Sequence, residues 1–245
     1  MRSVLLALCV ALSAAPALAA DIHVLTSGAF KPVLDAFLPA FEQRTGNKVL
    51  VVNDTSGGVA SRIARGDVFD LAVLTPATVA DLQRDGRVIL VTPIASAGIG
   101  VAVRKGAPKP DISTQAAFKA ALLAAPSVAM VDPASGGSSG IYLSKLFEQM
   151  GIAAQMKPKL VLTQGGLSAE PVAEGKAALA LGQASELLAV PGATVVGPLP
   201  AELQTRTVYV ASMNPKAAEA PLILLAALAG PEMQAILKAK GMGPP

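Results

Sequence analysis

The sequence is poor in the side chains that carry most thiol, metal and stacking chemistry. Its only cysteine is Cys9, it contains no tryptophan, and aromatic residues make up 3% of the chain. Cys9 lies in an N-terminal segment that we expect to be removed, which excludes disulfides, zinc–thiolate sites, iron–sulfur clusters and cysteine nucleophiles from the mature chain. The scarcity of aromatic rings argues against sugar stacking and against an aromatic cage for quaternary amines. We expect no cofactor.

Histidine is as scarce as cysteine. His23 is the only one, it lies in an expected strand, and a Ser–His–Asp triad would have to depend on it, so we expect a structural role. No metal-ligand spacing and no Gly-Lys-Ser/Thr phosphate loop is present, which leaves metal binding and nucleotide hydrolysis without support. Asp132 and Glu186 follow expected strands, and either could act as a base, but capping or solvent-facing roles are the expectation. We therefore predict no catalytic residue and no metal site.

Charge of one sign is not concentrated anywhere along the chain. The 20 lysines and arginines against 17 aspartates and glutamates give a formal net charge of +3. The basic residues are scattered, whereas a nucleic-acid interface needs them clustered on one surface. We expect no nucleic-acid partner.

Residues 1–19 have the pattern of a cleavable secretory signal peptide. Arg2 precedes the apolar run 4–12, and the small residues Ala17 and Ala19 follow it. The run is too short to cross a bilayer as a helix, which takes about 20 apolar residues, and no second long apolar run follows. We expect cleavage near Ala19, export to the periplasm, and a mature protein that does not span a membrane.

Beyond the signal segment, short apolar runs alternate with segments of helical periodicity. This alternation predicts an α/β fold with parallel sheet covered by helices on both faces. The expected strands are 22–25, 48–52, 69–74, 128–131, 159–162, 177–181 and 194–196; the expected helices are 29–44, 59–65, 76–84, 118–123, 140–150, 171–174, 217–229 and 231–240.

Two extended segments, 88–103 and 207–211, interrupt this rhythm and are interpreted as crossings between two lobes. Lobe I is expected to comprise 20–93 and 209–245, and lobe II 94–208. Each lobe should be a mostly parallel sheet flanked by helices. Two such lobes joined by a two-stranded hinge form a clamshell that closes around a ligand. We expect the protein to act as a monomer.

Four strand-to-helix junctions share a small, hydroxylated, glycine-rich composition. In open α/β sheets, ligands bind beyond the carboxyl ends of the strands, where helix N-termini offer N–H groups and partial positive charge to an anion. Glycine allows close approach of the backbone, and serine adds a hydroxyl donor. Capping explains any one junction equally well, but their recurrence predicts a small-anion site between the lobes. The candidate residues at these junctions are Ser27, Gly28, Ala29, Ser56, Gly57, Ser138, Ser139, Gly165 and Gly166.

The order and spacing of several motifs resemble the periplasmic molybdate-binding proteins of ABC importers. The motifs are 55–66, 69–73, Asp132-Pro133, 139–142 and 230–241. The resemblance implies the type II binding-protein clamshell and an ABC-transporter permease as partner. It places the family's first ligand serine on Ala29, the second on Ser56, main-chain contacts on Ser139 and near Gly165 and Gly166, and the ligand tyrosine on Gln183. The side chains at Ala29 and Gln183 therefore depart from the molybdate pattern.

Segments 103–113 and 183–192 resemble a divergent branch of the same family that includes a periplasmic aconitate isomerase, which moves an allylic proton on a tricarboxylate. Glutamine both donates and accepts hydrogen bonds, so Gln183 suits an organic acid as well as an oxyanion. The resemblance implies a binding protein for a molybdate- or tungstate-like oxyanion or a small polycarboxylate. The alternative is an aconitate isomerase. The effector lobe of a transcription factor has the same fold, but the signal peptide argues against it.

Overall fold

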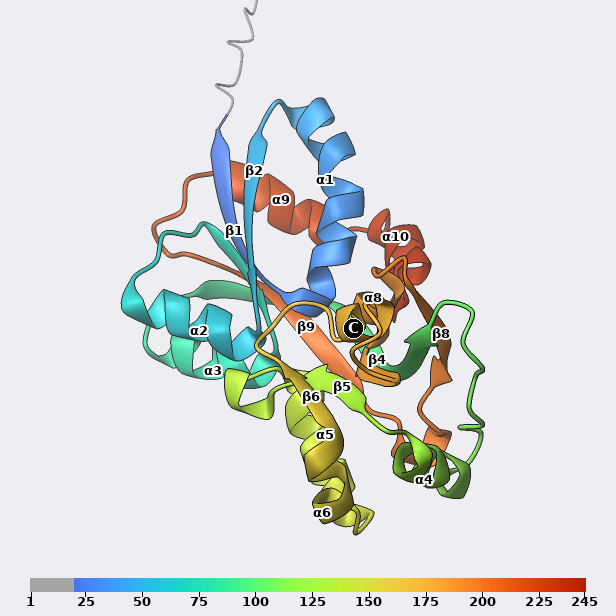
Figure 1. The fold of residues 1–245 in the computed structure, drawn as a ribbon. Helices are drawn as coiled ribbons and strands as arrows, with labels where there is room; N and C mark the ends of the chain where they lie inside the picture. Colours follow the sequence, from blue (N-terminus) through green and yellow to red (C-terminus); the bar gives the residue numbers. More distant parts are fainter. Residues whose placement is uncertain (1–19) are drawn as a thin grey trace, which may run out of the picture.

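A computed structural model describes residues 20–245 of the chain. The predicted signal peptide, 1–19, and Cys9 lie outside the described residues. Strands and helices alternate along the chain (Figure 1). Their order is β1 (Asp21–Ser27), α1 (Lys31–Thr45), β2 (Lys48–Asp54), α2 (Ser56–Arg65), β3 (Leu71–Leu74), α3 (Pro76–Arg84), β4 (Ile89–Arg104), α4 (Gln115–Ala124), β5 (Val128–Val131), α5 (Ser138–Gln149), α6 (Ala153–Met156), β6 (Leu160–Thr163), α7 (Glu170–Ala173), β7 (Leu179–Gln183), α8 (Ala184–Leu188), β8 (Ala193–Pro198), β9 (Arg206–Met213), α9 (Ala220–Leu228), α10 (Met233–Ala239) and β10 (Met242–Gly243).

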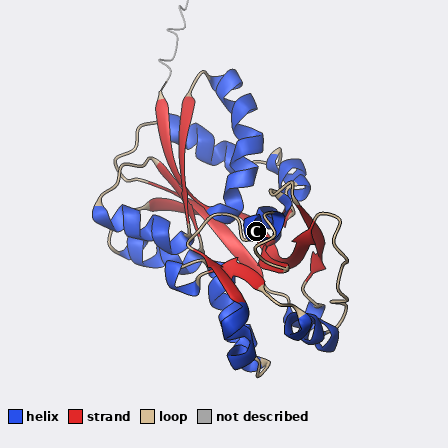
Figure 2. Cartoon of the chain, viewed as in Figure 1, coloured by secondary structure: helices blue, strands red, loops and turns tan. Residues whose placement is uncertain are grey.

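The strands form a continuous sheet in the order β2-β1-β3-β9-β4-β7-β5-β6, with helices on both faces (Figure 2). Strand β1 pairs in parallel with β2 and β3, and β5 pairs in parallel with β6 and β7. The long strands β4 and β9 run antiparallel to their neighbours. The predicted α/β class is confirmed, with antiparallel pairing at the centre of the sheet.

Strand β4 connects the two halves of the sheet. Its first part, Ile89 to Gly98, pairs with β9, and its second part, from Ile99 onward, pairs with β7 and β8. We call the region of β1–β3 and its helices the first half, and the region of β5–β8 and its helices the second half. The lobe boundaries at 93/94 and 208/209 stay a prediction.

Alternation along the buried strands builds a core on each face of the sheet. In the first half, Val24 packs with α1, α9 and α10, whereas its neighbour Leu25 packs with α2 and α3. Successive side chains of a strand point to opposite faces, so a strand covered on both sides must be apolar throughout. The second half repeats the pattern, with Met130 facing α5 and Ala129 facing α7 and α8. Apolar burial on both faces thus accounts for the apolar runs of these buried strands.

No single helix within residues 20–245 has the length and apolar character needed to cross a membrane. Helices α9 and α10 reach that length and apolar character only when taken together, and they are bent by 61° relative to each other. Leu224, Leu228 and Leu237 from this pair belong to the core of the first half. Their apolar character is accounted for by packing against the sheet.

Candidate functional site

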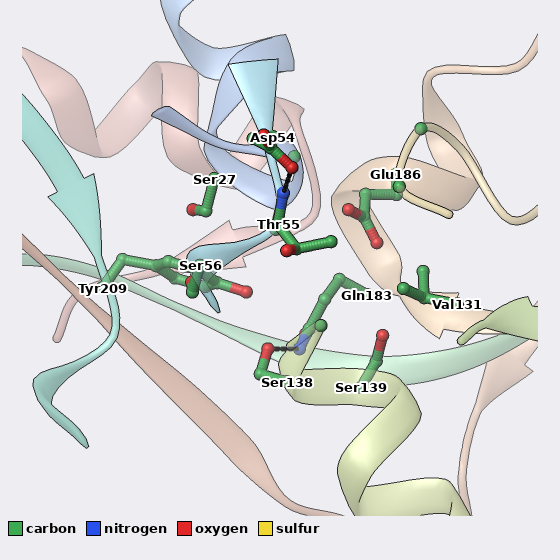
Figure 3. A pocket seen from close by; sticks show the side chains of 15 residues that line it. Ser27, Asp54, Thr55, Ser56, Val131, Ser138, Ser139, Gln183, Glu186 and Tyr209 are labelled. Atoms are coloured by element: carbon green, nitrogen blue, oxygen red, sulfur yellow. Dashed lines mark hydrogen bonds between the residues drawn. The ribbon is translucent and has the colours of Figure 1, made fainter. Parts of the chain in front are cut away.

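A hollow lies between the two halves, at the carboxyl ends of β1, β2, β5, β6 and β7. Parallel strands present these ends at the same edge of the sheet, and the helices that follow begin there. Figure 3 shows the polar side chains around the hollow, with Tyr209 and Glu186 reaching it from opposite sides. The lining residues are Ser27, Gly28, Ala29, Asp54, Thr55, Ser56, Val131, Gly137, Ser138, Ser139, Gly165, Gly166, Gln183, Glu186 and Tyr209.

The structure brings nearly all the predicted site residues together in this hollow. Gly57 is the exception, because it packs against Gly136 beside the hollow instead of lining it. Its N–H donates to the Gly136 carbonyl at 3.2 Å, and a Cβ on Gly57 would lie 2.8 Å from the Gly136 Cα. Glycine is needed here because two backbones touch. The ligand-binding role of the predicted residues stays a prediction.

Hydrogen bonds join the two halves around the hollow. The Thr55 hydroxyl donates to the Ser135 carbonyl, and the Ser185 hydroxyl donates to the Ala29 carbonyl at 2.7 Å. The Tyr209 hydroxyl bonds to Ser138. Each bond links segments that are far apart in the sequence, and each would be lost if the halves separated. In this structure the two halves are thus in direct contact around the hollow.

The junction between β2 and α2 is formed by capping bonds and an ion pair. The Thr55 hydroxyl accepts from the Gly58 N–H at 2.9 Å, which caps the helix. Asp54 accepts from the Thr55 N–H at 2.8 Å and from Arg62 Nε at 2.9 Å. These bonds hold Ser56 at the helix start, where it is buried against the hollow. The negative charge of Asp54 is compensated by Arg62 of the same helix.

The junction between β7 and α8 carries a carboxyl group without such compensation. Gln183 precedes α8, and its backbone N–H donates to Glu186, as in a capping box. Burial raises the pKa of Glu186 to about 7, and the bond from Gln183 offsets only part of that rise. Glu186 Oε2 has no hydrogen-bond partner among the described residues. Glu186 was expected to have a capping or a solvent-facing role. The bond from Gln183 fits capping, but the side chain is buried at the hollow and does not face solvent.

Tyr209 is a second group in the hollow that sequence reasoning did not assign. It lies on β9, is 1% exposed, and bonds to Ser138. Burial raises the pKa of its hydroxyl, and the nearby Glu186 carboxylate raises it further, so the phenol keeps its proton. It offers a neutral donor to a ligand. Tyr209 and Tyr142 are the only tyrosines in the chain, and the position of Tyr209 in the expected return crossing was the available clue.

Several polar atoms of the hollow lack a partner within the protein. Gln183 Nε2 donates to Thr207 Oγ1 at 2.9 Å and contacts Ser138 Oγ at 3.3 Å, which leaves Gln183 Oε1 unpaired. Ser27 Oγ is likewise buried and unpaired in the described part of the chain. Buried polar groups are almost always hydrogen-bonded, and leaving one unpaired costs about 1–3 kcal/mol. These atoms mark where a polar ligand would restore the missing bonds.

The electrostatic character of the hollow is neutral except at Glu186 and Asp54. No lysine, arginine or histidine from residues 20–245 contributes to its lining, and Asp54 is paired with Arg62. No cluster of three or more possible metal ligands occurs among those residues either. An anion here would meet hydroxyls, amide groups and helix starts, together with one protonatable acid.

A second, larger hollow adjoins the first and shares Gly166 with it. Its cavity volume is about 530 Å³, against about 20 Å³ for the first, so a ligand longer than a tetrahedral oxyanion would have to extend into the second hollow. Its lining residues are Lys31, Pro32, Asp35, Asn53, Gly166, Leu167, Glu170, Ser185, Leu188, Ala189, Ala239 and Lys240.

The remaining candidates from the sequence lie outside the first hollow. Asp132 caps a 3₁₀ turn by accepting from the Ala134 N–H at 2.9 Å, and it also accepts from Gln164 at 2.8 Å, which confirms its capping role. His23 lies on β1, away from the hollow, with its Nδ1 3.4 Å from Asp70 Oδ2. Neither faces Glu186 across the hollow.

Comparison with known sequences gives the family. The sequence model of the bacterial extracellular solute-binding proteins matches residues 22–243. The chain belongs to this family. One relative of this solute-binding protein is the aconitate isomerase of Pseudomonas sp, which is 35% identical over 95% of this chain and 93% of its own length.

Solved structures of solute-binding proteins share the fold. The periplasmic molybdate-binding protein of Azotobacter vinelandii superposes with a TM-score of 0.77 at 19% identity, covering 91% of this chain and 99% of its own. The sulfate-binding protein of Mycobacterium tuberculosis gives a TM-score of 0.73 at 17% identity, covering 92% of this chain and 87% of its own. At these identities the likeness concerns the fold alone.

Proposed function

We propose that this solute-binding protein is exported to the periplasm and closes its cleft on a small carboxylate anion, with a tricarboxylate of the aconitate type as the first candidate. The observation that carries the proposal is the composition of the first hollow. It combines unpaired neutral groups, such as Ser27 Oγ and Gln183 Oε1, with one buried protonatable carboxyl, Glu186.

A protonated carboxyl at Glu186 provides a hydrogen-bond donor that suits a carboxylate ligand. Glu186 can donate its proton in a charge-assisted hydrogen bond to a ligand carboxylate, the short and strong type of bond. Once ionised, the same group would repel any anion, an oxyanion and a polycarboxylate alike, in a site that lacks a cation among its described lining residues. The second hollow supports the same choice, because it gives a longer molecule somewhere to extend.

An oxyanion such as molybdate or tungstate is the second candidate. It is favoured by the serines at the helix starts, Ser56 and Ser139, both buried at the hollow. Helix N-termini and hydroxyls suit a tetrahedral dianion with no cation present. The position that the resemblance assigns to a ligand tyrosine carries Gln183, but Tyr209 brings a phenol into the same hollow.

Closure couples ligand binding to recognition by a partner. The bonds from Thr55 to Ser135 and from Ser185 to Ala29 exist only when the halves are shut. A ligand that contacts both halves stabilises this state in proportion to its differential affinity for it. We propose that the closed, monomeric form presents the ligand to an ABC-transporter permease.

The test is thermal unfolding of the mature protein against citrate, tricarballylate, cis- and trans-aconitate, molybdate, tungstate, sulfate and phosphate. A ligand at 100 times its dissociation constant should stabilise the folded state by about 2.7 kcal/mol, which is a shift of several degrees. We expect the tricarboxylates to give the largest shift. A shift with molybdate or tungstate alone would replace the proposal by the second candidate.

The site assignment has its own control. Changing Ser56→Ala and Gln183→Ala together should weaken the effective ligand by about 10- to 1,000-fold, because two hydrogen-bonding groups of about 1–2 kcal/mol each are removed. Ser61→Ala, on the exposed side of α2, should leave the affinity unchanged. Unchanged affinity in the double variant would place the ligand elsewhere.

A further inference from the structure

We infer that Glu186 is an acid–base catalyst that takes a proton from one carbon of a bound unsaturated polycarboxylate and returns it to another. This inference rests on the proposed carboxylate ligand and goes further, since it names the residue that performs a chemical step at this site. The observations are the position of the carboxyl at the hollow, its burial, and its unpaired oxygen.

The backbone around Glu186 leaves the carboxyl free to contact a ligand. Glu186 is 6% exposed, and it lines the hollow together with Gly28. A Cβ on Gly28 would lie 2.6 Å from Glu186 Oε1, so glycine at this position makes room for the carboxyl. No salt bridge involves Glu186 within the described residues, unlike Asp54, which is bound to Arg62. The carboxyl is therefore not occupied by a structural ion pair.

Burial, and not a charged neighbour, favours the neutral form of Glu186 in the empty site. From β9, Tyr209 presents a protonated phenol, and from the end of β2, Asp54 presents a carboxylate paired with Arg62. Burial raises the pKa of Glu186 to about 7, which is the range where a group can both accept and donate a proton near neutral pH. The charged groups around the adjoining hollow are Lys31, Asp35, Glu170 and Lys240.

The two hollows together match a molecule with carboxylates at both ends. Two pairs of adjacent residues lie at the boundary between the hollows. Glu186 and Asp54 line the first hollow, and their neighbours Ser185 and Asn53 line the second. A carboxylate held by the neutral donors of the first hollow would leave the next carbons of the ligand beside Glu186. A distal carboxylate would then extend toward Lys31 and Lys240. Lys31 is bound to Asp35 at 2.7 Å, whereas Lys240 has no salt bridge in the described part of the chain.

The chemical step is a proton transfer that balances without a co-reactant. The ionised Glu186 removes a proton from the methylene carbon next to the double bond, and the electrons of that C–H bond form the new double bond. The electrons of the old double bond take up a proton from the Glu186 carboxyl at the far carbon. The developing negative charge spreads onto the substrate carboxylates, where Ser27, Ser56 and Tyr209 hydroxyls can stabilise it. The products are a shifted double bond and a regenerated carboxylate.

The experiment combines a binding readout with a turnover readout on the same protein. The mature chain is incubated with cis-aconitate or trans-aconitate, and interconversion is followed by proton NMR; the melting shift with each compound is measured in parallel. We expect the wild type to interconvert the two. Glu186→Gln should keep the melting shift, because glutamine also suits the capping position, and should lose at least about 100-fold in rate. Glu148→Gln, an exposed change on α5, should match the wild type.

The outcomes separate this inference from the proposed function. If no tricarboxylate shifts the melting temperature, the proposed function fails. If tricarboxylates bind but the wild type does not interconvert them, or Glu186→Gln does so at the wild-type rate, the catalytic inference is overturned while binding stands. If Glu186→Gln no longer binds, the pH profile of the wild type decides. The rate must fall as Glu186 is protonated below about pH 7 while the melting shift persists, and a flat profile overturns the inference.

Discussion

Two acidic residues line the same hollow, and their surroundings differ. Asp54, at the end of β2, accepts a backbone N–H and is paired with Arg62 at 2.9 Å. Glu186, in the first turn of α8, is buried and has no salt bridge in residues 20–245. Each lies at the carboxyl end of a strand that pairs in parallel with a neighbour, β2 for Asp54 and β7 for Glu186. Their positions in the fold are therefore similar.

The difference teaches that a partner, and not the residue type, decides what a buried carboxyl can do. Pairing with Arg62 commits Asp54 to a structural role. Isolation in a poorly solvated site brings the pKa of Glu186 close to neutrality, where its proton is exchangeable. Predictions that replace each acid by its amide test this contrast directly.

The largest expected effect is a stability gain in Glu186→Gln at high pH. The folded pKa is about 7 against 4.5 for the free side chain, so wild-type stability falls as pH rises from 4.5 through 7. A shift of that size corresponds to about 3 kcal/mol at pH 8. The variant, which carries no charge, should melt about 5–10 °C above the wild type at pH 8 and gain little at pH 4.5. Thermal unfolding at both pH values measures this, and an equal difference at the two would contradict it.

Next in size is the effect of Gly57→Ala on closure. The added methyl carbon would lie 2.8 Å from the Gly136 Cα, so the halves could not approach to the closed distance. Affinity for the effective ligand should fall by about 10- to 100-fold, because closure would have to overcome this contact. The unliganded protein should remain as stable as the wild type, since alanine is the better helix former in α2. Titration calorimetry measures the affinity.

Small-angle scattering supplies the control for that prediction. The wild type should become more compact when ligand is added, whereas Gly57→Ala should contract less. Ser61→Ala, on the same helix, should contract as the wild type does. Normal affinity and normal contraction in Gly57→Ala would show that the contact with Gly136 is not part of the closed state.

The smallest effect is expected for Asp54→Asn. It removes an ion pair whose side chains are 34% and 27% exposed, and such pairs contribute about 1 kcal/mol or less. The variant should be slightly less stable than the wild type at pH 8, which is the opposite sign to Glu186→Gln. Chemical denaturation gives the difference, with Asp67→Asn as the matched change on the other partner of Arg62. A gain in stability for Asp54→Asn would contradict the structural role assigned to this ion pair.

Sequence predictions succeeded for features set by residues close together in the chain and failed for features set by contacts between distant segments. Strands such as β5, predicted at 128–131, are found at those residues because their apolar runs are bounded by turn residues. The serine–glycine junctions were recognisable because a helix start after a buried strand has few alternatives. Helix α8, Ala184–Leu188, was missed because it follows β7 directly, with no turn residue between Gln183 and Ala184 to mark its start. Because α8 carries Glu186, the direction of the Glu186 side chain could not be predicted either.

Sequence alone determined most of the alternation of strands and helices, the small-residue junctions and the family to which the chain belongs, because these depend on local periodicity and short motifs. Tertiary structure decided that Tyr209 and Glu186 meet the same hollow, although they lie on different elements. It also decided that Asp54 is paired and Glu186 is not, and that Gly57 touches Gly136. Desolvation and cross-chain contact depend on distances between distant segments, and no local pattern encodes those distances.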